Sequence, residues 1–229
     1  MNFSAINYND LHSQLLNLKV VVPPRGKGRT TEHCEQWQIY HLLIALLKIN
    51  YCTIPFSLKK RERPDFEILN GESSIGVEAT EIISPDHARA LTLPEGKKES
   101  SVIDPSLFKW GHDKYDLNDL REIVSREKLT GSGWVGNSVE DEFAQSLLDT
   151  INIKHNKFIN GFKRYNENFL LAYHNAPTPD LDFDLSITLI NSTLENYWGN
   201  GGFEKIIVHK YTTLLIFSET ECIKVENIS

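Results

Sequence analysis

The chain has 229 residues, of which 40% are hydrophobic, and a formal net charge of −7. This length fits one large domain, and the composition excludes a mainly disordered chain. The longest apolar stretch, residues 39–49, is too short for a transmembrane helix and contains His41 and Lys48. The three cysteines are irregularly spaced, which argues against a disulfide framework. No basic segment followed by an apolar one stands at the N-terminus, so we expect a cytoplasmic protein with no membrane partner.

The charge is unevenly distributed along the chain. Residues 1–64 contain nine basic and four acidic side chains, whereas the rest of the chain is strongly acidic. Most basic side chains of this first part stand in two short runs: Arg25, Lys27 and Arg29, and then Lys59, Lys60, Arg61 and Arg63. A localised basic edge on an acidic protein favours contact with a polyanion such as nucleic acid at that edge. The alternative is that each run is a solvated loop.

The first part of the sequence predicts a helix followed by three strands. Residues 1–23 form an N-terminal arm with a short amphipathic segment. Thr30 or Thr31 is a suitable N-cap for a helix over residues 32–49, whose apolar residues recur at helical spacing. The Asn70-Gly71-Glu72 sequence predicts a hairpin turn between the second and third strands. These three strands are expected over residues 52–56, 65–69 and 74–83.

The rest of the chain predicts an insertion, a long helix and the remainder of a sheet. Residues 84–136 form the insertion, with a helix near residues 117–128 and a Gly-rich end where Trp134 is either a hydrophobic anchor or a substrate contact. The later elements are a long helix over 139–165, a strand over 168–173, a helix over 185–197, and strands over 205–210 and 213–217. This order predicts one α/β domain with a mixed sheet over residues 1–229. Its core comprises residues 30–83 and 130–175, and residues 176–229 extend it at the C-terminus.

Two acidic residues, Asp65 and Glu78, stand among apolar residues of adjacent predicted strands. Alternate residues of a strand share a face, so Glu78 and Thr80 point together while Val77 and Ala79 point the other way. A buried acid is costly unless a cation or a proton offsets its charge, and two acids on neighbouring strands repel each other. Mg²⁺, or Mn²⁺ in its place, is held by one or two carboxylates plus water and phosphate oxygens, which suits Asp65 and Glu78.

The pair Pro64-Asp65, followed after twelve residues by Glu78-Ala79-Thr80, resembles the motif of the PD-(D/E)XK nuclease superfamily. The predicted order of elements also resembles the α-β-β-β-α-β core of that superfamily, the restriction-endonuclease-like fold. The resemblance covers about residues 30–83 and 130–175. It implies metal-dependent cleavage of phosphodiester bonds, with Asp65 and Glu78 as metal ligands and the carbonyl of Ala79 as a candidate third ligand.

The chain departs from this motif at Thr80, where the superfamily has a lysine. Threonine cannot supply a positive charge, so either the fold is inactive or another lysine reaches the site. The long helix offers Lys154, which at about 100° per residue lies within the apolar stripe. A lysine there must find a partner or reach water. We expect Lys154 to replace the motif lysine, and the alternative is a lysine that extends past the sheet edge into solvent.

The first helix offers two further acids for the expected metal site. Glu35 lies on the apolar stripe of this helix, and Glu32 lies on its flank. The superfamily often completes its metal site with a glutamate from this helix, so the resemblance implies Glu35 first and Glu32 second. The alternative is that acids in a first turn stabilise the helix dipole whichever face they occupy.

These residues together predict a Mg²⁺- or Mn²⁺-dependent endonuclease whose expected substrate is DNA. Asp65, Glu78 and Lys154 would be its catalytic residues, and the two basic runs would contact phosphates. Many proteins of this fold work as homodimers, so a homodimer is an open expectation. Two alternatives also stay open: a nuclease-like fold kept for binding nucleic acid or protein without cleavage, and an unrelated α/β binding domain with the two acids far apart.

Overall fold

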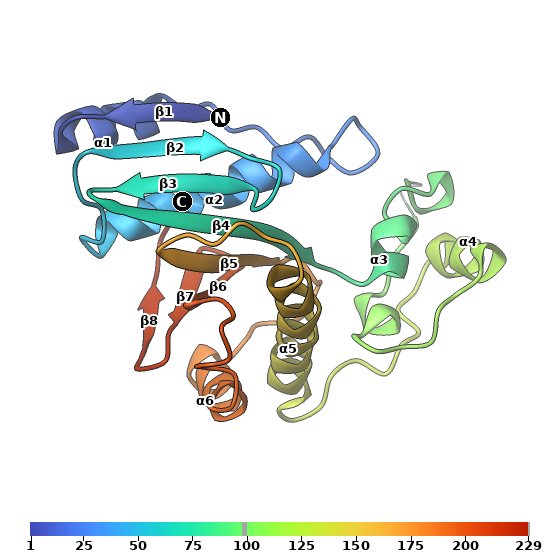
Figure 1. The fold of residues 1–229 in the computed structure, drawn as a ribbon. Coiled ribbons are helices and arrows are strands. Elements are labelled where there is room, and N and C mark those ends of the chain that lie inside the picture. The colour runs from blue at the N-terminus through green and yellow to red at the C-terminus, as the bar shows by residue number, and fades with distance from the viewer. Residues whose placement is uncertain (98–99, 229) are drawn as a thin grey trace.

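The computed structural model describes residues 1–97 and 100–228, so residues 98, 99 and 229 of the predicted domain lie outside the described residues. Its centre is an eight-stranded sheet whose strands follow one another in chain order (Figure 1). They are β1 (Asn2–Ala5), β2 (Phe56–Lys60), β3 (Phe66–Asn70), β4 (Ser73–Ile82), β5 (Glu167–His174), β6 (Lys205–Lys210), β7 (Thr213–Phe217) and β8 (Cys222–Val225). Neighbours β4, β5 and β6 are parallel, and the other neighbouring pairs of this sheet are antiparallel. The predicted α/β class with a mixed sheet is confirmed.

Helices cover both faces of the sheet. Helices α1 (Tyr8–Asn17) and α2 (Thr31–Lys48) pack against one face, and α5 (Ser138–Ile159) and α6 (Phe183–Leu194) pack against the other. In Figure 1, α2 lies behind the sheet and α5 lies in front of it. Side chains along β4 alternate between the two faces of the sheet. Val77 belongs to the core beneath α2, and Ile82 belongs to the core beneath α5. No helix of the described residues is long and apolar enough to span a bilayer.

Residues at the ends of α2 and α5 explain where these helices begin and end. The side chain of Thr30 accepts a hydrogen bond from the N–H of His33, and the His33 ring accepts one from the N–H of Thr30, which closes a capping box. Helix α5 ends at Ile159, six residues earlier than predicted. Its C-cap is Asn160, and Gly161 follows at the position where helices most often stop.

The first predicted strand was wrong in position. Strand β2 covers Phe56–Lys60 rather than residues 52–56, because Pro55 has no N–H to donate and the buried side chains alternate only from Phe56 onward. Lys59 and Lys60 therefore lie in the sheet and not in a loop. The hairpin turn was right: β3 and β4 are joined by two residues, and Gly71 takes the left-handed conformation, with φ of 65°. The edge strands β1 and β8 were not predicted, because each has only four residues.

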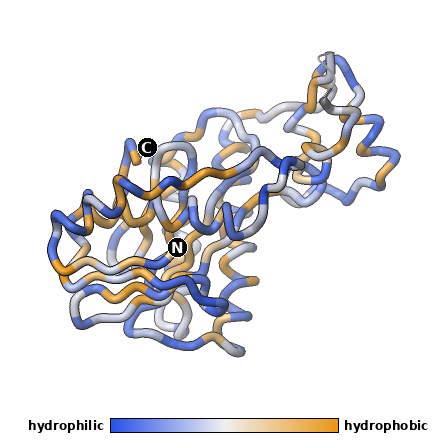
Figure 2. The backbone as a smooth tube through the Cα atoms, turned by 90° about the horizontal axis from the view of Figure 1, so that it is seen from above, coloured by the Kyte–Doolittle hydropathy of each residue, from blue (hydrophilic) through white to orange (hydrophobic). Residues whose placement is uncertain are grey.

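The insertion forms a lobe at one side of the sheet, as Figures 1 and 2 show. Its described residues include α3 (Pro85–Ala90), the short 3-10 helices η1 (Pro94–Lys97) and η2 (Pro105–Phe108), and α4 (Leu117–Ser125). The predicted helix near residues 117–128 is confirmed as α4. A small hydrophobic core of its own, around Phe108, Leu120 and Val124, holds the lobe together.

Two tryptophans fix the insertion to α5. The indole N–H of Trp134 donates to Glu142 Oε2 at 2.6 Å, and the backbone N–H of Trp110 donates to Glu142 Oε1 at 2.7 Å. The indole of Trp110 donates to Asp149, about two turns beyond Glu142 along the helix. Trp134 thus joins the insertion to α5 through a hydrogen bond of its indole, rather than as the hydrophobic anchor that the sequence suggested.

Candidate functional site

The open end of the β3–β4 hairpin places two carboxylates beside one peptide unit. The ladder between β3 and β4 stops at the pair Phe66 and Val77. Asp65 stands just before β3, and its Oδ2 accepts a hydrogen bond from the backbone N–H of Ala79 at 2.8 Å. Glu78 precedes Ala79 on β4, and its side chain is only 9% exposed. The two acids identified from the sequence thus both lie next to Ala79, Asp65 through this hydrogen bond and Glu78 as its neighbour in the chain, and the charge of Glu78 acts on Asp65.

Lys154 reaches these acids from α5. Its Nζ lies 2.7 Å from Glu78 Oε1 and 3.5 Å from the carbonyl oxygen of Ala79. The side chain is 16% exposed, so the structure brings the lysine to the acids rather than past the sheet edge. A positive charge therefore stands beside Glu78 although Thr80 occupies the usual lysine position.

A second lysine, Lys60, approaches from the α2 side at the end of β2. Its Nζ lies 2.5 Å from Glu35 Oε2 and 3.6 Å from Asp65 Oδ1. Lys60 thus links Glu35 to Asp65, but the structure does not group Glu35 with Asp65 and Glu78 as a third metal ligand among the described residues. It does not place Glu32 there, because Glu32 is exposed and accepts a hydrogen bond from Gln36 on the next turn of the helix.

We call these five side chains, Glu35, Lys60, Asp65, Glu78 and Lys154, the carboxylate cluster. With every group ionised, three carboxylates and two ammonium groups carry a net charge of −1. Burial raises the pKa of the Asp65 carboxyl and the charge of Glu78 raises it further, whereas the backbone hydrogen bond and the two lysines lower it. Because the upward effects prevail, the site favours a group that neutralises the charge of Asp65, either a proton or a further cation.

The donor atoms of the carboxylate cluster fit a small divalent cation. Among the described residues, no three His, Cys, Asp or Glu side chains are grouped as a metal site by themselves. The available set is therefore the carboxylates of Asp65 and Glu78 with the carbonyl of Ala79. Mg²⁺ suits such a set, because it keeps several waters and takes one or two carboxylates plus phosphate oxygens. A doubly charged ion would change the net charge of the cluster from −1 to +1, which is complementary to a phosphodiester.

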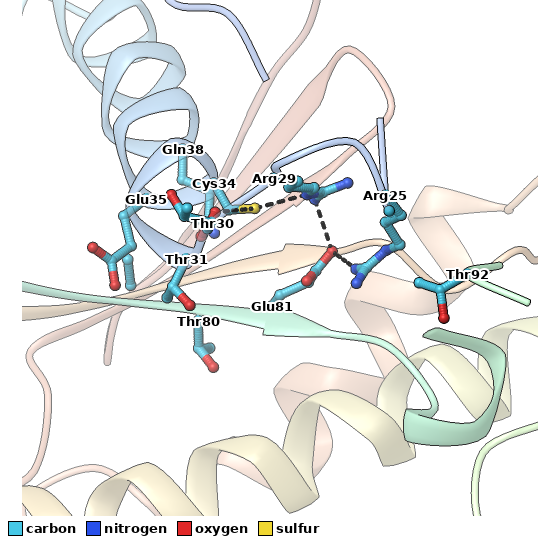
Figure 3. A pocket seen from close by; sticks show the side chains of 12 residues that line it. Arg25, Arg29, Thr30, Thr31, Cys34, Glu35, Gln38, Thr80, Glu81 and Thr92 are labelled. Carbon is cyan, nitrogen blue, oxygen red and sulfur yellow. Dashed lines mark hydrogen bonds and ion pairs between the residues drawn. The ribbon is translucent and has the colours of Figure 1, made fainter. Parts of the chain in front are cut away.

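Two cavities border the carboxylate cluster. One, of about 380 Å³, lies on the α5 side and is lined by Arg63, Glu78 and Lys154. The other, of about 270 Å³, lies between the start of α2 and β4, and we call it the α2 cavity (Figure 3). Figure 3 shows Glu35 at one end of the cavity and Arg25, Arg29 and Glu81 at the other, and Ala79 also belongs to the lining. The donor set is thus approached from both sides of β4.

Acidic partners hold several side chains of the two predicted basic runs. Arg25 and Arg29 both contact Glu81, and Arg61 pairs with Glu67 at 2.8 Å. Lys60 contacts Glu35 and Asp65, as described above. The remaining three members of the runs are exposed: Lys27, Lys59 and Arg63.

The place of Lys60 in the carboxylate cluster was not predicted from the sequence. Lys60 was expected to contact phosphate from outside the core. The alternation Phe56-Leu58-Lys60 is the signal that places its side chain on the same face as two buried residues.

Comparison with known proteins finds no matching family model, no significantly similar curated protein and no significantly similar solved structure. The geometry of the carboxylate cluster is therefore the basis of the functional argument.

Proposed function

We propose that the chain is a divalent-metal-dependent nuclease with a restriction-endonuclease-like core, and that it hydrolyses phosphodiester bonds in DNA. The observation that carries the proposal is the meeting of Asp65, Glu78 and Lys154 around Ala79. Two acids and a cation at the end of one hairpin are the groups that metal-assisted hydrolysis of a phosphodiester requires. The order α2, β2, β3, β4, α5 and β5 supports the same fold.

The proposed reaction divides the work among the residues of the cluster. Asp65 and Glu78 would hold the metal ion, which when bound supplies a Lewis acid for the phosphate. Lys154 donates a hydrogen bond to a non-bridging phosphate oxygen and stabilises the negative charge that develops there. Lys60 and Glu35 hold Asp65 in place from the α2 side. A water oxygen forms a bond to phosphorus, the bond to the leaving oxygen breaks, and the leaving oxygen ends with a proton from that water.

Incubation with supercoiled and linear DNA in the presence of Mn²⁺ tests the proposal. We expect the wild-type chain to cut DNA only when metal is present, and Asp65→Ala to lose at least about 100-fold of that rate. Asp113→Ala, which removes an exposed carboxylate from the insertion, is the matched control and should cut as the wild type does. A folded wild-type chain that leaves both DNA forms intact would contradict the proposal.

The second candidate function is nucleic-acid or protein binding by an inactive nuclease-like fold. The ion pairs of Lys154 with Glu78 and of Lys60 with Glu35 favour it, because they offset most of the cluster's negative charge without a metal. Thr80 at the motif position favours it as well. This candidate requires that Mg²⁺ or Mn²⁺ binding does not depend on Asp65 and Glu78, whereas the nuclease requires that it does.

A further inference from the structure

The end of the α2 cavity away from the carboxylate cluster is cationic. Arg25 and Arg29 converge there on one oxygen, Glu81 Oε1, at 2.5 and 3.1 Å (Figure 3). The amide of Asn175 donates to the same oxygen at 2.6 Å. A single carboxylate thus neutralises only one of the two guanidinium charges, so this end of the cavity has a net charge of about +1 from these three side chains. In a chain with a net charge of −7, such a local surplus is a binding feature for an anion.

The hydrogen-bonding groups of this end fit phosphate. Arginine presents its N–H groups in a planar fork that matches phosphate oxygens. The N-terminal end of α2, which starts at Thr31 on the wall of the cavity, adds the positive end of the helix dipole.

The size of the α2 cavity limits what can enter it. Its volume of about 270 Å³ is just below the ~300–1,000 Å³ of pockets that hold drug-sized ligands. Gly26 of the loop and Thr92 of the insertion bound its cationic end, as Figure 3 shows for Thr92. The cavity therefore takes a phosphate group with part of one nucleotide, and it is too small to enclose a duplex.

The spacing along β4 relates the cationic end to the metal donors. Ala79 and Glu81 both line the cavity and are two residues apart, which is about 7 Å along a strand. Consecutive phosphates of one strand lie about this far apart through space, because the 3.4 Å rise per nucleotide measures only the component along the helix axis, so the separation corresponds to about one nucleotide step. A phosphate held at the arginines would thus belong to the same strand as a phosphodiester at the carboxylate cluster.

We propose that Arg25 and Arg29 bind the terminal phosphate of a nucleic-acid strand, so that the enzyme cuts from strand ends. This inference rests on the proposed nuclease function. A terminal phosphate carries a charge of about −1.5 to −2 and three acceptor oxygens. An internal phosphodiester has a single charge and two free oxygens, so the surplus positive charge and the two guanidinium groups favour the strand end. Cleavage then releases products of one or two nucleotides.

Cleavage of matched DNA substrates tests the end requirement. One duplex sequence is prepared with 5′-phosphate ends, with 3′-phosphate ends, with hydroxyl ends only, and as a covalently closed circle, each with Mn²⁺. We expect one phosphorylated end to be cut about tenfold faster or more than hydroxyl ends, as charge-assisted hydrogen bonds predict, with products of one or two nucleotides. The phosphorylated arm that is faster identifies the strand polarity. The circle should resist cleavage.

Variants of the loop assign the effect to the arginines. Arg25→Gln should reduce the preference for the phosphorylated end to near unity, and Arg25→Lys should retain part of it because the charge stays and the planar fork is lost. Lys19→Gln removes an exposed positive charge elsewhere in the N-terminal arm and should keep the full preference. Melting temperatures measured alongside identify any variant that fails to fold. If Arg25→Gln does not fold, the end preference of Arg25→Lys is compared with that of the wild type instead.

A binding measurement separates this inference from the nuclease proposal. The same labelled oligonucleotides are titrated with the wild-type chain in EDTA, where no cleavage occurs. Tighter binding of the phosphorylated end without cleavage in Mn²⁺ would support the phosphate site and overturn the nuclease. Equal cleavage of all four substrates, the circle included, would overturn the phosphate site and leave the nuclease standing. Equal binding of phosphorylated and hydroxyl ends with no cleavage would overturn both.

Discussion

Lys154 contributes a positive charge to the carboxylate cluster from a helix, at a distance of 76 residues from its partner Glu78. Lys154→Ala should lower the cleavage rate by about 100-fold or more, because the developing charge on the phosphate loses its donor. It should also reduce the free energy of unfolding of the metal-free chain by about 1–3 kcal/mol, because Glu78 keeps its buried charge without a partner. Urea denaturation in EDTA measures this second effect.

The control for Lys154→Ala is Lys128→Ala, which changes an exposed lysine of the insertion that lines neither of the two cavities. It should leave the cleavage rate and the unfolding midpoint within about twofold and about 0.5 kcal/mol of the wild-type values. If a folded Lys154→Ala variant cut DNA as fast as the control, Lys154 would have no part in the reaction.

The ionised carboxylate of Asp65 should lower the free energy of unfolding of the metal-free chain in a pH-dependent way, and metal binding should remove this destabilisation. Burial and the charge of Glu78 raise the pKa of this carboxyl in the folded state above its ordinary 3.8. Below pH 3.8 the carboxyl is protonated in both the folded and the unfolded state, so its burial costs no stability from charge. As pH rises through the folded-state pKa, the buried carboxyl ionises and the fold loses stability. In EDTA at pH 7, Asp65→Asn should unfold at higher urea concentration than the wild type, and the difference should shrink toward pH 4.

Added Mg²⁺ should reverse this order, because only the wild type binds the ion and is stabilised, by about 2.7 kcal/mol when the ion is at 100 times its Kd. An Asp65→Asn variant that is less stable than the wild type in EDTA would show that the carboxylate is satisfied without a metal.

Single residues differ in how far the sequence determines their role. Asp65, Glu78 and Lys154 were located from strand alternation and helix periodicity, which are local patterns. The arginines of the α2 cavity were expected to face a polyanion, but their contact with Glu81 could not be predicted. That contact joins residues 52 and 56 positions apart, and no local pattern indicates which acid meets which base.

At the scale of elements, the anchoring of the insertion on α5 is open to a direct test. Trp134→Phe keeps the aromatic ring and removes the hydrogen bond to Glu142. We expect backbone amides of residues 117–125, in α4, to exchange with solvent faster, by an amount equivalent to about 1–2 kcal/mol of local opening. Exchange in β4 and β5 should not change. Faster exchange throughout the sheet would mean that the lobe and the sheet unfold as one unit.

The elements predicted well are those with a long periodic pattern or a strong terminal signal. Helix α2 and the hairpin of β3 and β4 belong to this group, through the cap at Thr30 and the turn at Gly71. Strand β2 was misplaced because Cys52 and Ile54 are apolar and resemble strand residues, although the ladder forms only beyond Pro55. This error mattered for function, since it concealed the position of Lys60 in the carboxylate cluster.

The whole molecule should lose stability in mild acid because of buried histidines. Burial lowers the pKa of His87 to about 4 and that of His209 to about 3, with further lowering by Arg25 for the first and by His41 for the second. Each neutral histidine therefore stabilises the fold above pH 6.5, and this contribution is lost as pH falls toward the folded-state values.

At 1.36 kcal/mol per pKa unit, each of these histidines should remove about 3 kcal/mol of stability by pH 4. Urea denaturation at pH 7 and pH 4 measures the loss, which should be about 3 kcal/mol smaller in His209→Gln. An equal loss in that variant and in the wild type would mean that His209 is not the group that titrates.

The most direct test of the proposed metal site is a calorimetric titration with Mn²⁺ in the absence of nucleic acid. The proteins to be compared are the wild-type chain, Asp65→Asn and Glu78→Gln. We predict that the wild type binds Mn²⁺ and that both variants lose this binding, because the two carboxylates supply the side-chain ligands. Metal binding that is equally strong in all three proteins, or absent from a folded wild type, would contradict this prediction.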